Sequence, residues 1–321
     1  MRSILLVKTS SLGDVIHNLP VVSDLRRRWP DLAIDWVVEE NFAAIPRLHP
    51  GVRRVIPVAI RRWRKQIGQG QTWREMAAFR RELQQDYYDL VIDTQGLVKS
   101  GLITWFANGL RCGYSAEVAR ERLAAFAYHC SYLIPPSAHA VERNRWLASA
   151  AAEYPLIDLP LDYGIHARTT APDWLPEQPF CVLLTATSRD DKLWPEAHWI
   201  ELGQRLHESG LRCVLPSGTQ RERERAERIA AASPASTVAP PADLDTLAAV
   251  LETARAVIGV DTGLTHLGAA LGRPVIALYV ATEPGLTGVL AGERALNLGG
   301  KGQCPTPEEV MIHVEKLLAE E

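Results

Sequence analysis

Buried strands that end in polar turns and lead directly into helices limit the fold of this chain more than any other feature. Ile4–Thr9 is a continuous apolar segment, and the polar turn Ser10–Asp14 and a helical pattern follow it. The same order recurs along the chain. Strands that alternate with helices pair in parallel through right-handed crossovers. The sequence therefore predicts an α/β protein built on parallel sheets.

The predicted strands fall into two groups, separated by a proline-rich stretch at Pro155–Pro179 that reads as a linker. We expect helices to fill Leu97–Tyr154, and Arg61–Gln71 interrupts the pattern as a basic loop. The strands are predicted at Ile4–Thr9, Ala33–Val38, Val52–Val58 and Tyr88–Asp93, and then at Phe180–Thr187, Arg212–Pro216, Ala256–Val260 and Pro274–Val280.

Composition limits the class of protein. Of the 321 residues, 47% are hydrophobic and 23% charged, as in soluble globular proteins. No apolar run approaches the roughly 20 residues that span a bilayer, and the apolar core after Met1 is too short for a signal peptide. The five cysteines are scattered, which favours reduced structural thiols over disulfides or a metal site. These features predict a cytoplasmic protein.

Charge is distributed unevenly. Residues 1–160 hold 21 basic and 16 acidic side chains, whereas residues 161–321 hold 14 and 22. A basic first half and an acidic second half suggest different partners for the two halves. The net charge of −3 and the absence of a nucleic-acid motif argue against a general nucleic-acid binder.

The turn after the first strand offers a carboxylate at a helix start. It lacks the Gly-Lys-Ser/Thr ending of a phosphate loop and the three glycines of a dinucleotide fingerprint. Gly13 permits a sharp turn, and Asp14 then lies near the helix N-terminus. The residues alone leave two interpretations open, a catalytic carboxylate or a helix cap.

The segment Asp261-Thr262-Gly263 gives a sharper signal, because a strand ends there and a helix begins at once. Free backbone N–H groups and the helix dipole make such a start an anion site. Asp261 would accept hydrogen bonds from sugar hydroxyls. A plain N-cap with a core glycine is the alternative, and the α/β context excludes an aspartic protease.

Other strand ends carry further candidates. Thr187, Ser188 and Lys192 suit a diphosphate, and Glu222 is placed to bind ribose hydroxyls. In the first half, basic residues around Trp63 and on later segments suit an anionic acceptor or a membrane surface. For each of these charged residues, the alternative to a binding role is a solvated surface position. For His266, the alternative is packing. No carboxylate pair has metal-site spacing, so no metal ion is expected.

Four segments, in this order along nearly the whole chain, resemble glycosyltransferase family 9, the lipopolysaccharide heptosyltransferases. They are Val7–His17, Asp93–Leu97, Arg189–Pro195 and Gly259–His266. The Lys-Thr-Ser-Ser form of the first segment and the basic loop around Trp63 are similar to the type I enzymes of that family.

The resemblance implies an inverting transferase with the glycosyltransferase-B fold, two Rossmann-like domains facing across a cleft. It implies ADP-L-glycero-β-D-manno-heptose as donor and the inner 3-deoxy-manno-octulosonate (Kdo) of Kdo2-lipid A as acceptor. No cofactor is expected. The enzyme would act in lipopolysaccharide inner-core synthesis, peripherally on the cytoplasmic face of the inner membrane. The expected domains are 1–160 for the acceptor and 161–305 for the donor. A helix in 306–321 is expected to pack either on the second domain or, as is usual for this fold, back on the first.

The resemblance also assigns site residues by position. Asp14 matches the catalytic base, and Lys192 is expected to stabilise the leaving ADP. The donor positions are Thr187, Ser188, Lys192, Glu222, Asp261, Thr262, Gly263 and His266. The acceptor candidates come from the first turn and the basic segments and not from motif positions of the family. They are Ser10, Ser11, Gly13, Arg61, Arg64, Lys65, Lys99 and Arg120.

Three alternatives remain open at this point. One is a family member that adds heptose further out on the core or uses a different sugar nucleotide. Another is a nucleotide-sugar-binding protein without catalysis. The third is a sugar-nucleotide epimerase of related fold.

Overall fold

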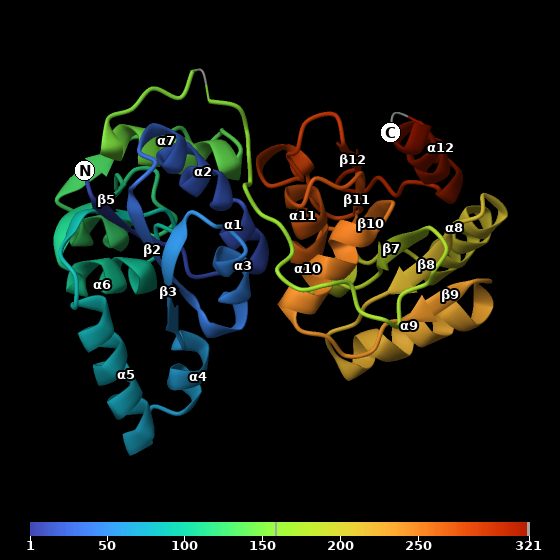
Figure 1. Cartoon of the computed structure of the whole chain (residues 1–321), viewed down its shortest axis with the longest axis horizontal. Helices are drawn as coiled ribbons and strands as arrows, with labels where there is room; N and C mark the ends of the chain where they lie inside the picture. The colour runs from blue at the N-terminus through green and yellow to red at the C-terminus, as the bar shows by residue number, and fades with distance from the viewer. Residues whose placement is uncertain (158, 320–321) are drawn as a thin grey trace. The chain divides into compact units, whose positions relative to one another are not determined.

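The computed structural model describes residues 1–157 and 159–319 and divides the chain into two compact units, Met1–Ile165 and His166–Glu321 (Figure 1). The expected boundary was at 160/161. The division falls inside the predicted linker Pro155–Pro179, which contains no described helix or strand.

The first unit is built on a six-stranded parallel sheet in the order β3-β2-β1-β4-β5-β6. The central strand β1 pairs with β2 on one side and with β4 on the other, so that Ile4 lies beside Ile34 and Leu90. The strands are β1 (Ser3–Val7), β2 (Ala33–Glu39), β3 (Val52–Val58), β4 (Tyr88–Asp93), β5 (Gly109–Tyr114) and β6 (Cys130–Tyr132).

Helices cover both faces of this sheet. Leu5 and Val7 of β1 belong to a core completed by side chains of α4, α5 and α6, whereas α7 contacts β4, β5 and β6 and packs on α2. The helices are α1 (Leu12–Ile16), α2 (Leu19–Arg28), α3 (Ala44–Arg47), α4 (Ile60–Lys65), α5 (Gly70–Leu83), α6 (Val98–Phe106) and α7 (Ala140–Ala152), with short 3-10 turns η1 (Glu40–Phe42) and η2 (Arg122–Ala127).

Two predictions for this unit were wrong. Leu97–Tyr154 contains β5 and β6 in addition to helices, because β5 is interrupted by Arg111 and two glycines and β6 has only three residues. The basic segment Arg61–Gln71 is not a loop throughout. It contains α4, in which Trp63 is buried in the core while the basic side chains face outward.

The second unit repeats the architecture, with a six-stranded parallel sheet in the order β12-β11-β10-β7-β8-β9. Numbered from β7, this is the order of the first sheet. The short strands β9 and β12 were not predicted. The strands are β7 (Phe180–Leu184), β8 (Arg212–Leu215), β9 (Ser236–Val238), β10 (Ala256–Val260), β11 (Val275–Tyr279) and β12 (Ala295–Gly299).

The C-terminal helix α12 packs on the second unit, to which it belongs. Val310, Met311 and Val314 enter a core that contains Trp199 and Leu202 of α8, so that α12 closes one face of its own sheet. Glu320, the last residue of the expected helix, lies outside the described residues. The remaining helices are α8 (Glu196–Glu208), α9 (Gln220–Ala232), α10 (Leu244–Thr253), α11 (Gly263–Ala270) and α12 (Pro307–Ala319), with 3-10 turns η3 (Asp190–Lys192) and η4 (Pro284–Leu286).

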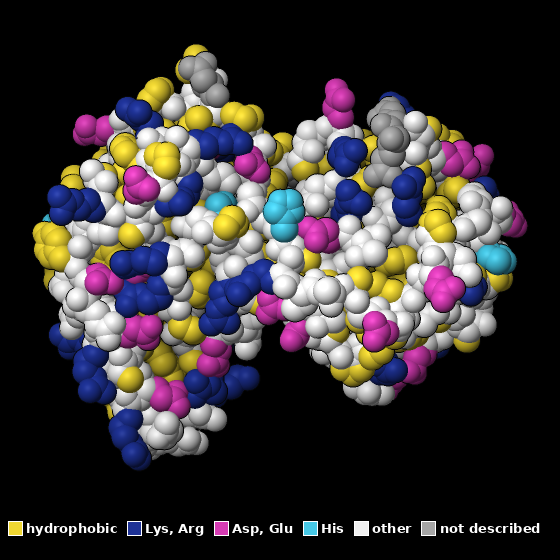
Figure 2. All heavy atoms as spheres, viewed as in Figure 1, with side chains coloured by type: hydrophobic (Ala, Val, Ile, Leu, Met, Phe, Trp, Pro, Cys, Tyr) yellow, Lys and Arg dark blue, Asp and Glu magenta, His cyan; other side chains and the backbone are white. Residues whose placement is uncertain are grey.

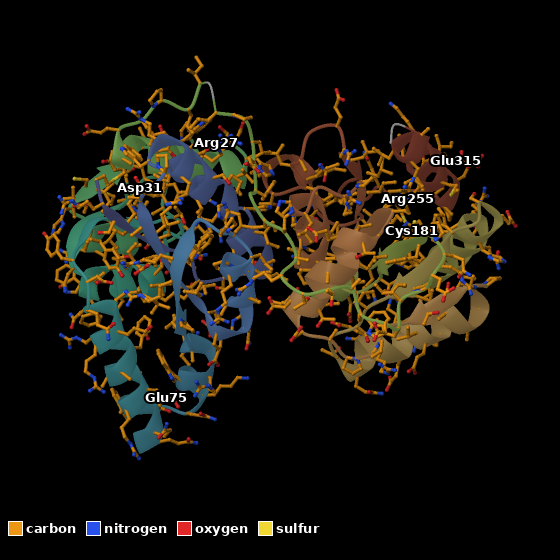
Figure 3. The ribbon with its side chains drawn as sticks, in the orientation of Figure 1. Arg27, Asp31, Glu75, Cys181, Arg255 and Glu315 are labelled. Carbon is orange, nitrogen blue, oxygen red and sulfur yellow. The ribbon has the colours of Figure 1, made fainter. Side chains whose placement is uncertain are left out.

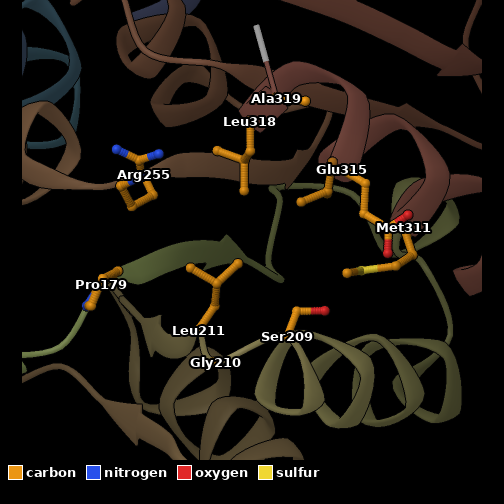
Figure 4. Close-up of a pocket in the computed structure, with 10 residues that line it drawn as sticks. Pro179, Ser209, Gly210, Leu211, Arg255, Met311, Glu315, Leu318 and Ala319 are labelled. Atoms are coloured by element: carbon orange, nitrogen blue, oxygen red, sulfur yellow. The ribbon is translucent and has the colours of Figure 1, made fainter. Parts of the chain in front are cut away.

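A hollow of about 460 Å³ lies under α12, where Met311 and Leu318 face Pro179 and Leu211 (Figure 4). Pro179 and Leu211 immediately precede β7 and β8, so this hollow is at the amino-terminal edge of the sheet. Ligands of open parallel sheets bind at the opposite edge, where the strands end. The polar turns described below are all at that opposite edge.

Candidate functional site

Each sheet has one point where neighbouring strands lead away in opposite directions, between β1 and β4 in the first unit and between β7 and β10 in the second. Crevices at such points, beyond the carboxyl ends of the strands, are the usual ligand sites of open α/β sheets. The candidate residues follow these strands in both units. The candidate residues therefore form one cluster in each unit, and each cluster is called a half-site.

Asp14 lies just beyond β1, in the first turn of α1, where its carboxylate is held from two sides. Its Oδ2 accepts hydrogen bonds from the backbone N–H of Ser11 (2.9 Å) and from the Ser11 hydroxyl (3.2 Å). Arg120 donates to Oδ1 at 2.7 Å. Asp14 thus does cap its helix, and the same carboxylate also forms an ion pair with a predicted acceptor residue.

Lys8 lies buried at the end of β1 and adds a second positive charge near Asp14. Its Nζ donates to the carbonyl oxygen of Thr94 (2.7 Å) and to Oδ1 of Asn144 (3.3 Å). Burial lowers the pKa of Lys8 to about 8, although the charge of Asp14 acts in the opposite direction. Burial of Asp14 acts to raise its pKa, but Lys8, Arg120 and the Ser11 hydrogen bond outweigh burial and hold that pKa well below its usual range. The carboxylate is therefore ionised at neutral pH.

The turn after β4 shapes the backbone beside Asp14. The Gln95 amide oxygen accepts from the backbone N–H groups of Thr9 (3.1 Å) and Ser10 (3.2 Å). Buried Asp93 in turn accepts hydrogen bonds from the backbone N–H groups of Gln95 and Gly96 and from the Tyr128 hydroxyl (2.8 Å). The φ of Gly96 is 67°, a backbone conformation that glycine adopts without strain. These contacts explain the Asp93–Gly96 motif as a support for the first turn.

The structure brings together part of the predicted acceptor set. Lys99 donates to the Ser10 hydroxyl at 2.7 Å, and burial lowers the pKa of Lys99. Ser10, Ser11, Gly13, Lys99 and Arg120 therefore surround Asp14.

The remaining acceptor candidates, Arg61, Arg64 and Lys65, lie on α4. The guanidinium of Arg61 is 5.4 Å from the ring centroid of Phe42, and its backbone N–H donates to Glu39. Arg64 lines an apolar groove instead. None of the three makes a hydrogen bond or ion pair with Asp14 in the described part of the chain.

In the second unit, Asp261 is the centre of the half-site. It follows β10, and its Oδ2 accepts from Lys192 Nζ (2.6 Å) and from the Thr282 hydroxyl (2.9 Å). The Thr187 hydroxyl donates to the Asp261 backbone oxygen at 2.9 Å. Segments after β7, β10 and β11 thereby converge on one carboxylate, so the motifs at Thr187–Lys192 and Asp261–Gly263 form one cluster.

The start of α11 lies next to this cluster. Thr262 is the N-cap and Gly263 the first helical residue, and the early N–H groups of a helix attract anions. Gly259 permits the close packing of the turn, because a Cβ there would lie 2.3 Å from Thr265 Oγ1 and 2.9 Å from Leu184 Cβ. His266 is buried one turn into the helix. A helix start beside a lysine suits a phosphate group.

Two other donor candidates lie at neighbouring strand ends. Ser188 is exposed in the segment after β7. Glu222 caps α9, since its Oε2 accepts from the N–H groups of Gly218 (2.7 Å) and Thr219 (3.2 Å) at the end of β8. Glu222 therefore stabilises the start of α9. It also lies at the strand end where acidic residues of nucleotide folds bind ribose.

The sequence analysis did not select Lys8, Gln95 or Thr282 as site residues. Lys8 and Gln95 stand inside segments that were singled out, but the contacts of their side chains join residues at least 85 positions apart. Thr282 follows β11, so the rule that strand ends carry ligands would have found it. In the described residues, no cluster of three or more His, Cys, Asp or Glu side chains could hold a metal ion.

Comparison with known proteins now decides the family. The sequence model of glycosyltransferase family 9 (heptosyltransferase) matches residues 76–316. The chain is 46% identical to lipopolysaccharide heptosyltransferase 1 of Escherichia coli strain K12, over 97% of this chain and 96% of that protein. The chain belongs to glycosyltransferase family 9. It is an enzyme that transfers a glycosyl group.

Solved structures agree with this family assignment. The structure described as E. coli heptosyltransferase WaaC with ADP superimposes with a TM-score of 0.92 at 43% identity, covering 98% of this chain and 99% of that one. The structure described as WaaC with ADP-2-deoxy-2-fluoro heptose gives 0.89 at the same identity and coverage. The two parallel sheets with their helices are the glycosyltransferase-B fold, as the sequence analysis predicted for family 9.

Proposed function

We propose that this enzyme transfers L-glycero-D-manno-heptose from ADP-heptose to the inner Kdo of Kdo2-lipid A. The observation that carries the proposal is the ionised Asp14 carboxylate, held at the end of β1 by Ser11 and Arg120. Family membership and the similarity to heptosyltransferase 1 support this choice of donor and acceptor.

In the proposed reaction, Asp14 acts as general base. The acceptor hydroxyl oxygen attacks the anomeric carbon of the heptose, the bond from that carbon to the β-phosphate oxygen breaks, and inverted product and ADP form. Asp14 takes the hydroxyl proton as the new bond develops. An aspartate of low pKa is a weak base in the ground state, but the hydroxyl becomes strongly acidic as the oxygen bonds to carbon. General-base catalysis contributes roughly 10² to 10⁴ in rate.

The donor half-site would bind the diphosphate. The N-terminus of α11 at Thr262 and Gly263 and the Lys192 ammonium stabilise the negative charge that develops on ADP. Thr187 and Ser188 line the same strand end. Asp261 and Glu222 have carboxylate oxygens for sugar hydroxyls, and His266 lies buried in α11.

The acceptor half-site would bind anions. Kdo carries a carboxylate and lipid A carries phosphates, which suits Arg120, Lys99 and the basic helix α4 with Arg61, Arg64 and Lys65. When the Kdo carboxylate forms an ion pair with Arg120, Asp14 loses its own ion-pair partner and becomes a stronger base. Because the acceptor is a membrane lipid, the enzyme would act peripherally at the cytoplasmic face of the inner membrane. No described helix is long and apolar enough to cross a bilayer.

Release of ADP from ADP-heptose tests the proposal, with three samples compared: no acceptor, Kdo2-lipid A, and Kdo2-lipid A that already carries the first heptose. We expect release only with unmodified Kdo2-lipid A. Release that requires the heptosylated lipid would assign the enzyme to a later step, and release without any acceptor would contradict transfer.

A further inference from the structure

Helices α4 and α5 form a helical hairpin, residues 60–83, that carries an apolar groove on the first unit. The groove has a volume of about 500 Å³ and lies between α4, α5 and α6. Figure 2 shows hydrophobic side chains between dark blue basic ones over these helices. Side chains that line it include Ile67, Trp73, Met76, Phe79, Leu102 and Phe106.

The hairpin is held in shape by polar contacts between its two helices, with Glu75 between them (Figure 3). Glu75 Oε2 accepts from Trp63 Nε1 (2.8 Å) and from Arg62 (2.6 Å). The Thr72 hydroxyl donates to the Gln66 backbone oxygen at 2.8 Å. Because these contacts cross-link α4 and α5, the groove exists without a ligand.

Large apolar side chains at the groove remain in contact with solvent. Trp73 and Leu102 are 57% exposed and Ile67 is 49% exposed. The indole N–H of Trp73 donates to the Ile67 backbone oxygen, so its polar end is satisfied while the ring stays exposed. On α6, exposed Val98 and Trp105 flank Leu102 at helical spacing and extend the apolar surface beyond the groove.

The hairpin also accounts for the positive charge of the first half. Residues 60–83 hold seven basic and two acidic side chains, whereas the rest of residues 1–160 hold 14 of each. Within the described chain no carboxylate lies at salt-bridge distance from Arg64, Lys65, Arg74 or Arg80. Arg80 stacks instead on Phe106, with 4.7 Å from its guanidinium carbon to the ring centroid.

We propose that the α4–α5 hairpin docks on the surface of a bilayer that contains anionic phospholipids. Ile67, Trp73 and Leu102 would enter the boundary between headgroups and acyl chains, and the flanking arginines would pair with lipid phosphates. Aromatic and aliphatic side chains beside uncompensated basic ones are the composition of interfacial helices. A protein partner of the groove would not by itself explain the concentration of charge.

The position of the hairpin connects docking to the reaction. Lys99 lines the groove and donates to the hydroxyl of Ser10, and the next residue, Ser11, donates to Asp14. Docking would therefore bring the acceptor half-site to the bilayer that contains the acceptor. This consequence rests on the proposed function, whereas the docking itself is measured without any substrate.

Sedimentation with vesicles tests the docking on the full chain, using phosphatidylcholine with phosphatidylglycerol against phosphatidylcholine alone. We expect binding to the anionic vesicles that weakens with salt. The double variant Arg74→Gln/Arg80→Gln should lower partitioning about 25-fold, at roughly fivefold for each basic residue. Trp73→Ala/Leu102→Ala should lower it at least about tenfold. The control Leu133→Ala removes a 71% exposed apolar side chain of the same unit and should change nothing.

Heptose transfer to fully deacylated, water-soluble Kdo2-lipid A separates docking from catalysis. We expect Trp73→Ala/Leu102→Ala to retain wild-type transfer to this acceptor, which also reports that the variant is folded. Absence of wild-type binding to anionic vesicles would overturn the docking proposal, and so would equal binding by the groove variants. If the wild type transfers heptose to no acceptor, the proposed function fails while the vesicle result still stands.

Discussion

The carboxylate of Asp14 and the guanidinium of Arg120 lie 2.7 Å apart, so the proposed base is paired with a proposed acceptor residue before any acceptor binds. The side chain of Asp14 is 15% exposed and that of Arg120 is 42% exposed. Arg120 is therefore the partner that an incoming anion reaches more easily.

Asp14→Ala should lower kcat at least a hundredfold, because the acceptor proton loses its base. Donor binding should survive, since Asp261, Lys192 and the start of α11 belong to the other unit. ADP release measures turnover, and calorimetry measures the binding of ADP-heptose. Asp14→Asn keeps the shape and the Ser11 contact as a control for folding. Near-wild-type turnover in Asp14→Ala would remove Asp14 from the mechanism.

Arg120→Ala should shift the acid limb of the pH–rate profile to higher pH. Arg120 lowers the pKa of Asp14 by its charge and its hydrogen bond, so its removal raises that pKa. A base of higher pKa becomes protonated sooner as the pH falls. The measurement is kcat/KM for the acceptor against pH, which reports the free enzyme in which Arg120 pairs with Asp14, with Arg120→Lys as the charge-preserving control. An acid limb unchanged from wild type in Arg120→Ala would contradict the electrostatic role.

Lys8→Met should change how stability depends on pH. Burial holds the pKa of Lys8 at about 8, below its ordinary value of 10.5, so the unfolded chain binds more protons between these pH values. The unfolding free energy of the wild type therefore rises over this range relative to Lys8→Met, by about 2 to 3 kcal/mol. Urea unfolding of both proteins at pH 8 and pH 10.5 measures the difference. Parallel pH dependence in the two proteins would show that Lys8 is not titrated by folding.

Lys192→Ala should lower kcat/KM for ADP-heptose by about a hundredfold, because the leaving diphosphate loses a positive charge and Asp261 loses its partner at 2.6 Å. Arg189→Ala is the matched control, since Arg189 is an exposed cation nearby that pairs with Asp191. Donor-saturation kinetics on both variants give the comparison. Equal kinetics for Lys192→Ala and wild type would return Lys192 to the role of a surface lysine.

The central strands could be predicted because they are buried on both faces. β1, β4, β7 and β10 read as nearly continuous apolar runs, which parallel strands produce. The edge strands β6, β9 and β12 could not, although the edge strand β3 was predicted with its observed bounds. β6 and β9 have three residues each and β12 is only half-buried, so their place in the sheet depends on pairing with a neighbour that the local sequence does not reveal.

The half-sites show the same division. Asp14, Lys192 and Asp261 stand at strand ends, so position and residue type were enough to select them. The support for Asp14 comes from Gln95, Arg120 and Lys8, whose side chains reach it or its turn only after β4 has paired beside β1. The packing of α12 could not be predicted because its amphipathic sequence does not show which apolar surface it covers. The core around Trp199 provides that surface.

Both sheets have one strand order, and each unit closes a hydrophobic core of its own. The enzyme therefore consists of two units that can change separately during evolution. With the acceptor bound by the first unit and the donor by the second, as proposed, loops beyond the first sheet can diversify toward new glycan acceptors without disturbing the fold of the donor unit. The reverse change is equally open. Chimeras joined at residues 165 and 166 would recombine two specificities without cutting through either core.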